Sequence, residues 1–156
     1  MLFRSSVISI ENNLFRSCSN LTSIAISEGV NSVGDYAFGD CTALTSITIP
    51  SSVSSIGSSV FQNCTSLSSI SIPEGVNSIG NYAFGDCTAL TNITIPDSVS
   101  SIGQYAFQSC SSLTSITISN SMNSISNGLF YDCTSLSSIT IPNSVSSIEK
   151  IGKSVV

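Results

Sequence analysis

The stretch VNSIGNYAFGDCTALTNITI, from Val76 to Ile95, decides the fold because close copies of it recur every 23 residues along the chain. Each copy carries a phenylalanine, a cysteine, a leucine and an Ile-x-Ile pair at fixed positions. A constant period of this length is typical of a solenoid, in which each repeat forms one coil that packs against its neighbours. The recurring cysteines are Cys18, Cys41, Cys64, Cys87, Cys110 and Cys133, and the Ile-x-Ile pairs are Ile24/Ile26, Ile47/Ile49, Ile70/Ile72, Ile93/Ile95, Ile116/Ile118 and Ile139/Ile141.

Each unit divides into three parts. The Ile-x-Ile pair alternates with polar residues, which predicts a short strand. Val76 and Ile79 predict an extended piece on the opposite side of the coil. Between them, apolar residues at Ala83, Cys87 and Leu90 have helical spacing over one to two turns. This segment is too short for an independent helix, so we expect a short α-helical or 3₁₀ turn.

Stacking of successive coils brings the Ile-x-Ile strands side by side in parallel, roughly 4.8 Å apart. We therefore expect one continuous parallel sheet along the solenoid, with ladders of like apolar side chains inside it. The repeats predict a single solenoid of about six coils over residues 1–149, followed by an irregular C-terminal tail at 150–156.

The charge pattern excludes several classes of function. Charged residues make up 8% of the chain, the net charge is −5, and neither Lys nor Arg occurs between Arg16 and Lys150. Nucleic acid binding and polybasic membrane contacts both need clustered cations, so we exclude them. The sequence has no apolar run of the ~20 residues that a membrane span needs. Val7 and Ile10 already keep the 23-residue register, which argues against a signal peptide in the first residues.

The sequence also predicts no enzyme, no cofactor and no metal site. It contains no histidine to act as a base for a serine nucleophile or as a zinc ligand. Glu74 and Asp97 share one position one coil apart and resemble a calcium or glycosidase pair, although two acids on an exposed turn are far more often solvated surface charge. The in-register cysteines predict a ladder of buried, free thiols and not disulfides, because stacked like residues point in the same direction.

The run VSSIGQYAFQSCSSLTSITI, from Val99 to Ile118, resembles the BspA-like leucine-rich-repeat family, also called the Treponema pallidum type, and the resemblance covers residues 7–148. It implies an α/β solenoid shaped like a horseshoe, with the Ile-x-Ile sheet on its concave face. It also implies cell-surface or secreted adhesins that bind host matrix proteins, host cells or other microbes, without shared catalytic residues. The Ser- and Asn-rich composition is similar to that of members from parasitic protists.

The candidate binding residues are the two polar positions that flank the first isoleucine of each Ile-x-Ile pair. With a period of two, the isoleucine points inward and its neighbours point outward on the concave face. Small polar residues also suit a crowded concave strand for structural reasons alone, and the absence of an aromatic or Arg anchor there argues against a strong hot spot. The outward residues are Ser46, Thr48, Ser69, Ser71, Asn92, Thr94, Ser115, Thr117, Ser138 and Thr140.

The leading hypothesis is a non-enzymatic adhesion solenoid of a microbial, parasitic-protist type, with protein partners such as host extracellular matrix or cell-surface proteins. One alternative is a structural repeat spacer without its own ligand, and another is an ice- or surface-binding solenoid that uses the Ser/Thr rows. Sequons at Asn20, Asn63 and Asn92 are expected by chance in so Ser/Thr/Asn-rich a chain.

The two ends form a further candidate contact surface. Neither end shows a polar capping repeat, so each is expected to expose an interior ladder and unpaired strand edges, which predicts self-association through the ends. The apolar residues expected there are Phe3, Val7, Ile10, Leu14 and Phe15 at one end, and Ile139, Ile141, Val145 and Ile148 at the other.

Overall fold

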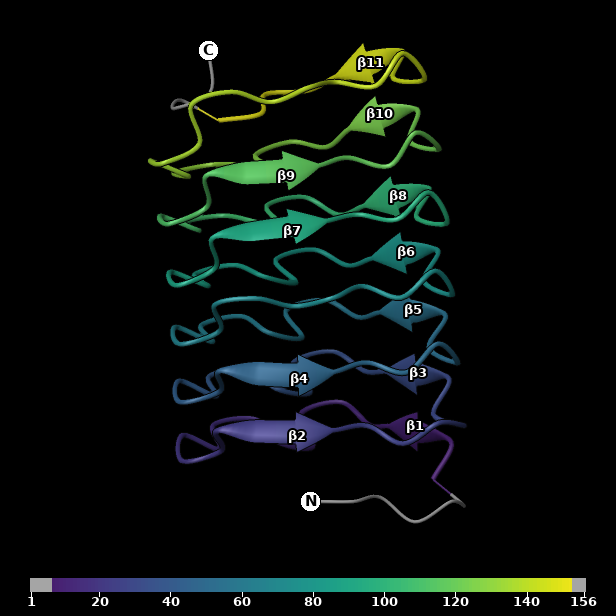
Figure 1. Ribbon diagram of the computed structural model, residues 1–156, viewed down its shortest axis with the longest axis vertical. Coiled ribbons are helices and arrows are strands. Elements are labelled where there is room, and N and C mark those ends of the chain that lie inside the picture. The colour runs from purple at the N-terminus through teal and green to yellow at the C-terminus, as the bar shows by residue number, and fades with distance from the viewer. Residues whose placement is uncertain (1–6, 153–156) are drawn as a thin grey trace.

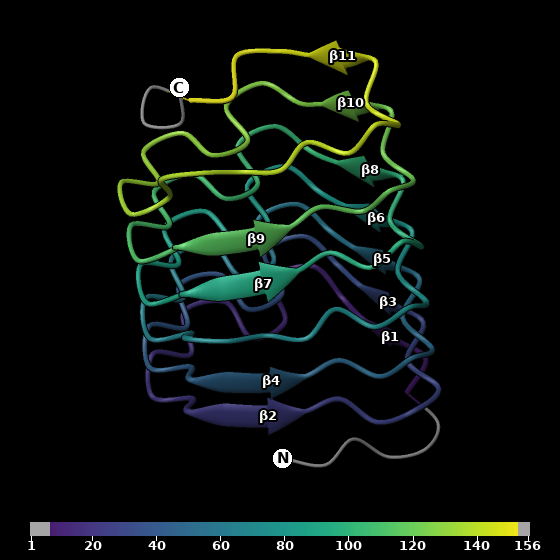
Figure 2. The ribbon, with the colours of Figure 1, turned by 45° about the horizontal axis from the view of Figure 1, so that its top comes forward.

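The 23-residue register holds from coil to coil in the computed structural model, which describes residues 7–152 (Figure 1). Ser32, for example, pairs with Ser55, and Ser55 pairs with Ser78. The coils stack in one column in both Figure 1 and Figure 2, with one row of strands in front and a second row behind. The predicted solenoid is therefore confirmed.

The rear row contains the longest sheet. It consists of two-residue strands of sequence Ser-Ile or Ser-Val, in which the serine points outward and the apolar residue is buried. These strands correspond to the extended piece that Val76 and Ile79 predict. The five-stranded parallel sheet contains β1 (Ser9–Ile10), β3 (Ser32–Val33), β5 (Ser55–Ile56), β6 (Ser78–Ile79) and β8 (Ser101–Ile102), and a separate pair contains β10 (Ser124–Ile125) and β11 (Ser147–Ile148).

The front row is the Ile-x-Ile face, and its expected continuous sheet is wrong. Strands β2 (Ser23–Ala25) and β4 (Ser46–Thr48) form one parallel pair, and β7 (Asn92–Thr94) and β9 (Ser115–Thr117) form another. The equivalent segments 69–71 and 138–140 keep their place in the stack but pair as strands with neither neighbour. Ser68 and Ser137 precede these two segments, whereas threonine holds that position in the other four coils.

This Thr-to-Ser difference coincides with lost hydrogen bonds. Thr45 donates both its backbone N–H and its Oγ1 hydroxyl to the carbonyl of Thr22, and Thr114 does the same to Thr91. Within the described chain, Ser68 makes neither bond to the preceding coil. Threonine is β-branched and favours extended backbone, so its replacement by serine weakens the strand at that point.

The third side of each coil consists of turns, and the predicted helical or 3₁₀ turns are absent from residues 7–152. Alternate N–H groups bond within the coil and to the next coil: Gly39 donates to Tyr36 at 3.0 Å, whereas Phe38 donates to Val60 at 2.9 Å. Tyr36 and Asp40 have φ of 55° and 61°, in the left-handed region that interrupts any right-handed helix. The non-glycine residues that share this φ are Asn13, Ser17, Tyr36, Asp40, Ser59, Asn63, Tyr82, Asp86, Tyr105, Ser109 and Asp132.

The backbone bonds between turns all run in the same sense along the stack. The N–H of one coil donates to a carbonyl of the coil that follows, as Phe61 does to Ala83 and Phe84 does to Ala106, both at 2.8 Å. The last described residues continue this pattern, because Phe130 donates to the carbonyl of Ile151 at 3.0 Å. Ile151 also packs partly buried against the core. Residues 150–152 thus cover part of the final described coil.

Ladders of like side chains fill the interior. The phenylalanine rings stack nearly parallel from coil to coil, with centroids 5.3 Å apart between Phe84 and Phe107 and 5.7 Å apart between Phe38 and Phe61. Leu44, Leu67 and their equivalents in the inner coils are completely buried. No buried side-chain nitrogen or oxygen atom in the described chain lacks a hydrogen-bond partner. Because one coil cannot enclose these side chains alone, stability depends on the stack.

The cysteine ladder is confirmed for five of the six thiols, which are free and buried. Each of the five donates from Sγ to a phenylalanine carbonyl of the preceding coil, as Cys64 does to Phe38 at 3.2 Å. Burial raises the pKa of Cys41 to about 11 and that of Cys64 to about 12, from an ordinary value of 9.0. Cys18 lies in the first described turn segment and is exposed, so the expectation that it is buried is wrong.

We expect native protein at pH 8 to react with a thiol reagent at Cys18 alone. The thiolate is the reactive species, and the other five thiols are both covered and kept protonated by their raised pKa. Labelling followed by peptide mass spectrometry measures this, and the variant Cys18→Ser should show no fast phase. Rapid modification of Cys87 in the folded state, or fewer than six free thiols after denaturation without reductant, would contradict the ladder.

Gly128 occupies the backbone position that tyrosine holds in the two preceding coils, and its φ of 65° is similar to the 57° of Tyr105. A Cβ atom built on Gly128 would collide with the Tyr105 ring, which leans toward the following coil. We therefore expect Gly128→Ala to lower the free energy of unfolding by roughly 1–3 kcal/mol. Gly85→Ala is the matched control, because the nearest atom to its added Cβ is 3.4 Å away. Equal urea midpoints for the two variants would refute this account.

The two faces of the front strands should respond differently to substitution. Ile93 is 3% exposed inside β7, so Ile93→Ala opens a cavity and should cost about 2–5 kcal/mol of unfolding free energy. Thr94 is the adjacent exposed residue, and Thr94→Arg points its charge into solvent and should cost less than about 1 kcal/mol. Chemical denaturation of both variants tests the assignment, which fails if the two losses are equal.

Candidate interaction surface

The ten outward residues of the Ile-x-Ile face form two rows along the front of the solenoid, which we call the outward rows. They arise because each isoleucine between them is buried or half-buried, and strand geometry then directs its neighbours to the other side. All ten are exposed, as the pattern predicts. The structure brings them onto one face. Their role in binding stays a prediction.

The outward rows differ from the neighbouring hydroxyl residues in how their polar groups are used. Elsewhere the side chains of Thr45, Ser52 and Ser98 donate to backbone carbonyls of the preceding coil at 2.6–3.0 Å and so stabilise the stack. In the outward rows only Asn92 makes a protein hydrogen bond among the described residues, from its side-chain amide to the Thr91 hydroxyl at 3.1 Å. The remaining nine hydroxyl groups are free to bind something other than the protein itself.

Two grooves cross the front face, one on each side of the β7–β9 pair. Groove A, of about 310 Å³, separates the unpaired segment 69–71 from β7, and groove B, of about 270 Å³, separates β9 from the unpaired segment 138–140. Groove A is lined by Ile70, Ser71, Ile72, Glu74, Asn92, Ile93, Thr94 and Pro96. Groove B is lined by Ile116, Thr117, Ile118, Asn120, Thr140 and Pro142.

The two grooves are equivalent in sequence. Pro96 and Pro142, Glu74 and Asn120, and Thr94 and Thr140 each stand 46 residues apart, which is two coils. The alternation of residues predicts Thr94, Thr117 and Thr140 on this face but does not predict grooves. The sequence feature that could have indicated the grooves is serine in place of threonine at positions 68 and 137, since these two coils lack front strands.

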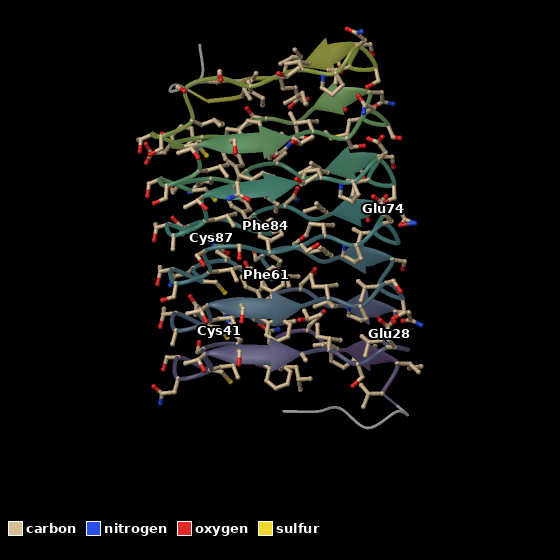
Figure 3. The ribbon with its side chains drawn as sticks, in the orientation of Figure 1. Glu28, Cys41, Phe61, Glu74, Phe84 and Cys87 are labelled. Atoms are coloured by element: carbon tan, nitrogen blue, oxygen red, sulfur yellow. The ribbon has the colours of Figure 1, made fainter. Side chains whose placement is uncertain are left out.

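Acidic residues gather where the front segments turn toward the rear sheet. Figure 3 shows Glu28 and Glu74 on this edge, with Cys41 and Cys87 on the opposite side of the coils. Asp97 follows Pro96, and its carboxylate accepts hydrogen bonds from the backbone N–H and the side-chain amide of Asn120 at 2.8 and 3.2 Å. Glu74 lines groove A and Asp97 touches a residue of groove B, so a negative edge runs beside both grooves.

The other candidate features concern metal binding, membrane insertion and glycosylation. Within residues 7–152, no group of three His, Cys, Asp or Glu side chains is placed to hold a metal ion. The same residues include no helix that could span a membrane. Of the sequon asparagines, Asn20 and Asn92 are exposed, whereas the Asn63 amide is half-buried and donates to Asp40 at 3.1 Å.

The chain is similar to known leucine-rich-repeat proteins. The model of the family described as "BspA type Leucine rich repeat region" matches residues 1–89 and 54–152, while no curated protein matches. A leucine-rich-repeat protein of T. pallidum superposes with a TM-score of 0.91 at 28% identity, over 97% of this chain and 72% of that one. A leucine-rich-repeat protein of Bacteroides ovatus superposes with a TM-score of 0.85 at 36% identity, over 92% of this chain and 41% of that one. The chain therefore belongs to the BspA-type leucine-rich-repeat family.

Proposed function

We propose that this chain is a non-enzymatic interaction module that binds a protein partner across its outward rows. The observation that carries the proposal is the set of nine exposed hydroxyl side chains that make no hydrogen bond to any residue of the described range 7–152. Leucine-rich-repeat solenoids typically mediate protein interactions, which supports the same function. An extended face of small polar groups suits a large, shallow contact better than a small-molecule site.

The proposed biological role is adhesion by a microbial surface or secreted protein, of the kind found in parasitic protists. Its partners would be host extracellular matrix or cell-surface proteins. Family membership supports this role, because BspA-type proteins are often associated with the cell surface. The absence of Lys and Arg between positions 16 and 150 gives the module an acidic surface, which favours partners with basic contact regions.

Two alternative functions require different features of the front face. A spacer without its own ligand needs no free polar rows, and the test below distinguishes it. An ice- or crystal-binding face needs a regular, unbroken lattice of hydroxyl groups. The front face instead consists of two separate strand pairs with unpaired segments between and beyond them, which argues against that alternative.

Self-association through the ends is a second proposed contact. Ile8 and Leu14 are 64% and 51% exposed in the first described coil, and Ile148 is 52% exposed near the other end. These are the apolar side chains that an end-to-end contact would remove from water. Ile10 is buried, contrary to its expected place on the exposed end, and Phe3 lies outside the described residues.

Immobilised fibronectin, fibrinogen, laminin and collagen provide the test of partner binding, with surface plasmon resonance as the measurement. Thr48→Arg combined with Thr117→Arg places two bulky charges on the front face. We expect this variant to lose at least tenfold in affinity for any matrix protein that the native chain binds. The matched control is Ser101→Arg, an exposed strand residue of the rear sheet, which should bind as the native chain does.

Two results would overturn the proposal. If none of the four matrix proteins binds above background, the chain behaves as a spacer toward that class of partner. If Ser101→Arg weakens binding as much as the front-face variant does, the partner does not use the outward rows. Circular dichroism spectra of all variants establish first that the solenoid is intact.

A further inference from the structure

The β7–β9 pair stands between two equivalent grooves, and this arrangement constrains what can lie across it. Groove A follows the edge of β7 and groove B follows the edge of β9, so their centres are two coils apart along the solenoid axis. With strands roughly 4.8 Å apart, the two grooves are about 9.6 Å from each other. A ligand that occupies both grooves must present similar side chains at that spacing.

A polyproline II helix has this repeat. It rises 3.1 Å per residue with three residues per turn, so residues i and i+3 lie on one face about 9.3 Å apart. A β-strand does not fit, because its side chains alternate and residues i and i+3 point to opposite faces. An α-helix along the same line brings residues i and i+7 to one face about 10.5 Å apart, which matches the spacing of the grooves less well.

The chemistry of the grooves suits the same conformation. Each groove joins apolar surface from isoleucine and a proline, Pro96 or Pro142, to exposed polar side chains such as Thr94 or Thr140. The unpaired segments 69–71 and 138–140 offer backbone groups that no neighbouring strand uses. A polyproline II segment likewise has no internal hydrogen bonds, so its own carbonyls remain available as acceptors.

Small side chains allow a peptide to cross the pair between the grooves. The outward residues of β7 and β9 are Asn92, Thr94, Ser115 and Thr117, and none is large enough to block a chain that lies over them. The carboxylates of Glu74 and Asp97 stand beside this path, and no described cation pairs with either one, since the one ion pair of the described chain joins Arg16 to Asp40. The ligand is therefore expected to carry a basic residue at this point.

We infer that the front face binds an extended segment in the polyproline II conformation, with proline or another apolar residue at positions i and i+3 and a Lys or Arg beside them. The segment runs along the solenoid axis, seats one residue in groove A and the other in groove B, and directs its cation toward Glu74 and Asp97. The inference rests on the proposed function, for which it names the class of partner.

The test uses three fluorescent twelve-residue peptides and the full chain. (Pro-Pro-Lys)₄ has both the conformation and the charge, (Pro-Pro-Glu)₄ has the conformation alone, and (Gly-Ser-Lys)₄ has the charge alone. Fluorescence anisotropy at 150 mM salt should give a Kd for (Pro-Pro-Lys)₄ at least tenfold lower than for either of the others. Binding of (Gly-Ser-Lys)₄ with equal affinity would reduce the effect to non-specific charge attraction and overturn the inference.

Substitutions locate the peptide on the protein. Thr94→Arg and Thr140→Arg each obstruct one groove and should weaken (Pro-Pro-Lys)₄ binding at least tenfold. Ser101→Arg is the matched control, because Ser101 is an exposed strand residue of the rear sheet, outside both grooves and the outward rows, and it should leave the affinity unchanged. Glu74→Gln should weaken binding and reduce its salt dependence. Equal effects of Ser101→Arg and Thr94→Arg would overturn the groove assignment.

The outcomes separate this inference from the proposed function. If a matrix protein binds the outward rows but excess (Pro-Pro-Lys)₄ does not displace it, and the peptide does not bind by itself, the interaction module stands and the polyproline II partner is wrong. If the peptide binds in the grooves while no matrix protein binds, the inference holds and the proposed matrix partners are wrong.

Discussion

Hydrogen bonds between successive coils hold this protein together, and every other feature depends on their constant register. A coil of 23 residues has too few contacts of its own to offset the entropy lost on ordering, so it folds only against a neighbour. Because the backbone bonds keep the 23-residue register, most interior side chains stack on their own kind, as the phenylalanine rings do at 5.3–5.8 Å. The fold is thus specified by repetition, and equivalent surface residues of successive coils also align in rows.

The same register explains why so few charges are present. Like residues stack at the spacing of the coils, so a charged residue repeated at one position would place equal charges beside one another. Serine, threonine and asparagine avoid this repulsion, and many of their side chains donate to the preceding coil, as Ser54 and Ser100 do. The outward rows differ because their hydroxyl groups do not donate to the preceding coil.

The sequence predicted the register, the buried positions of the inner coils and the outward rows, because these depend only on which residues recur. It did not predict the backbone of the turns. The spacing of Ala83, Cys87 and Leu90 shows which side of the chain is apolar, but a helix and a series of hydrogen-bonded turns satisfy that spacing equally. The sign of φ at Tyr82 and Asp86 decides between them, and it follows from bonds to the adjacent coil that a single repeat does not reveal.

The grooves were beyond prediction for a related reason. The Ile-x-Ile pairs are nearly identical in all coils. The loss of strand pairing at residues 69–71 and 138–140 coincides with the loss of a single methyl group, because serine replaces threonine at positions 68 and 137. So small a difference matters because a two- or three-residue strand has few bonds to lose. Within a nearly uniform array, the irregular coils are therefore the most informative ones about function.

The turn side of the stack has an electrical direction of its own. Because every backbone bond between turns runs from the N–H of one coil to a carbonyl of the next, the peptide dipoles that make those bonds add along the solenoid axis. Aligned peptide dipoles leave partial negative charge where carbonyls lack donors and partial positive charge where N–H groups lack acceptors, as they do in an α-helix. Without any helix, this column of turns is polarised from its N-terminal coil to its C-terminal coil, and another coil that extends it in register must have the same orientation.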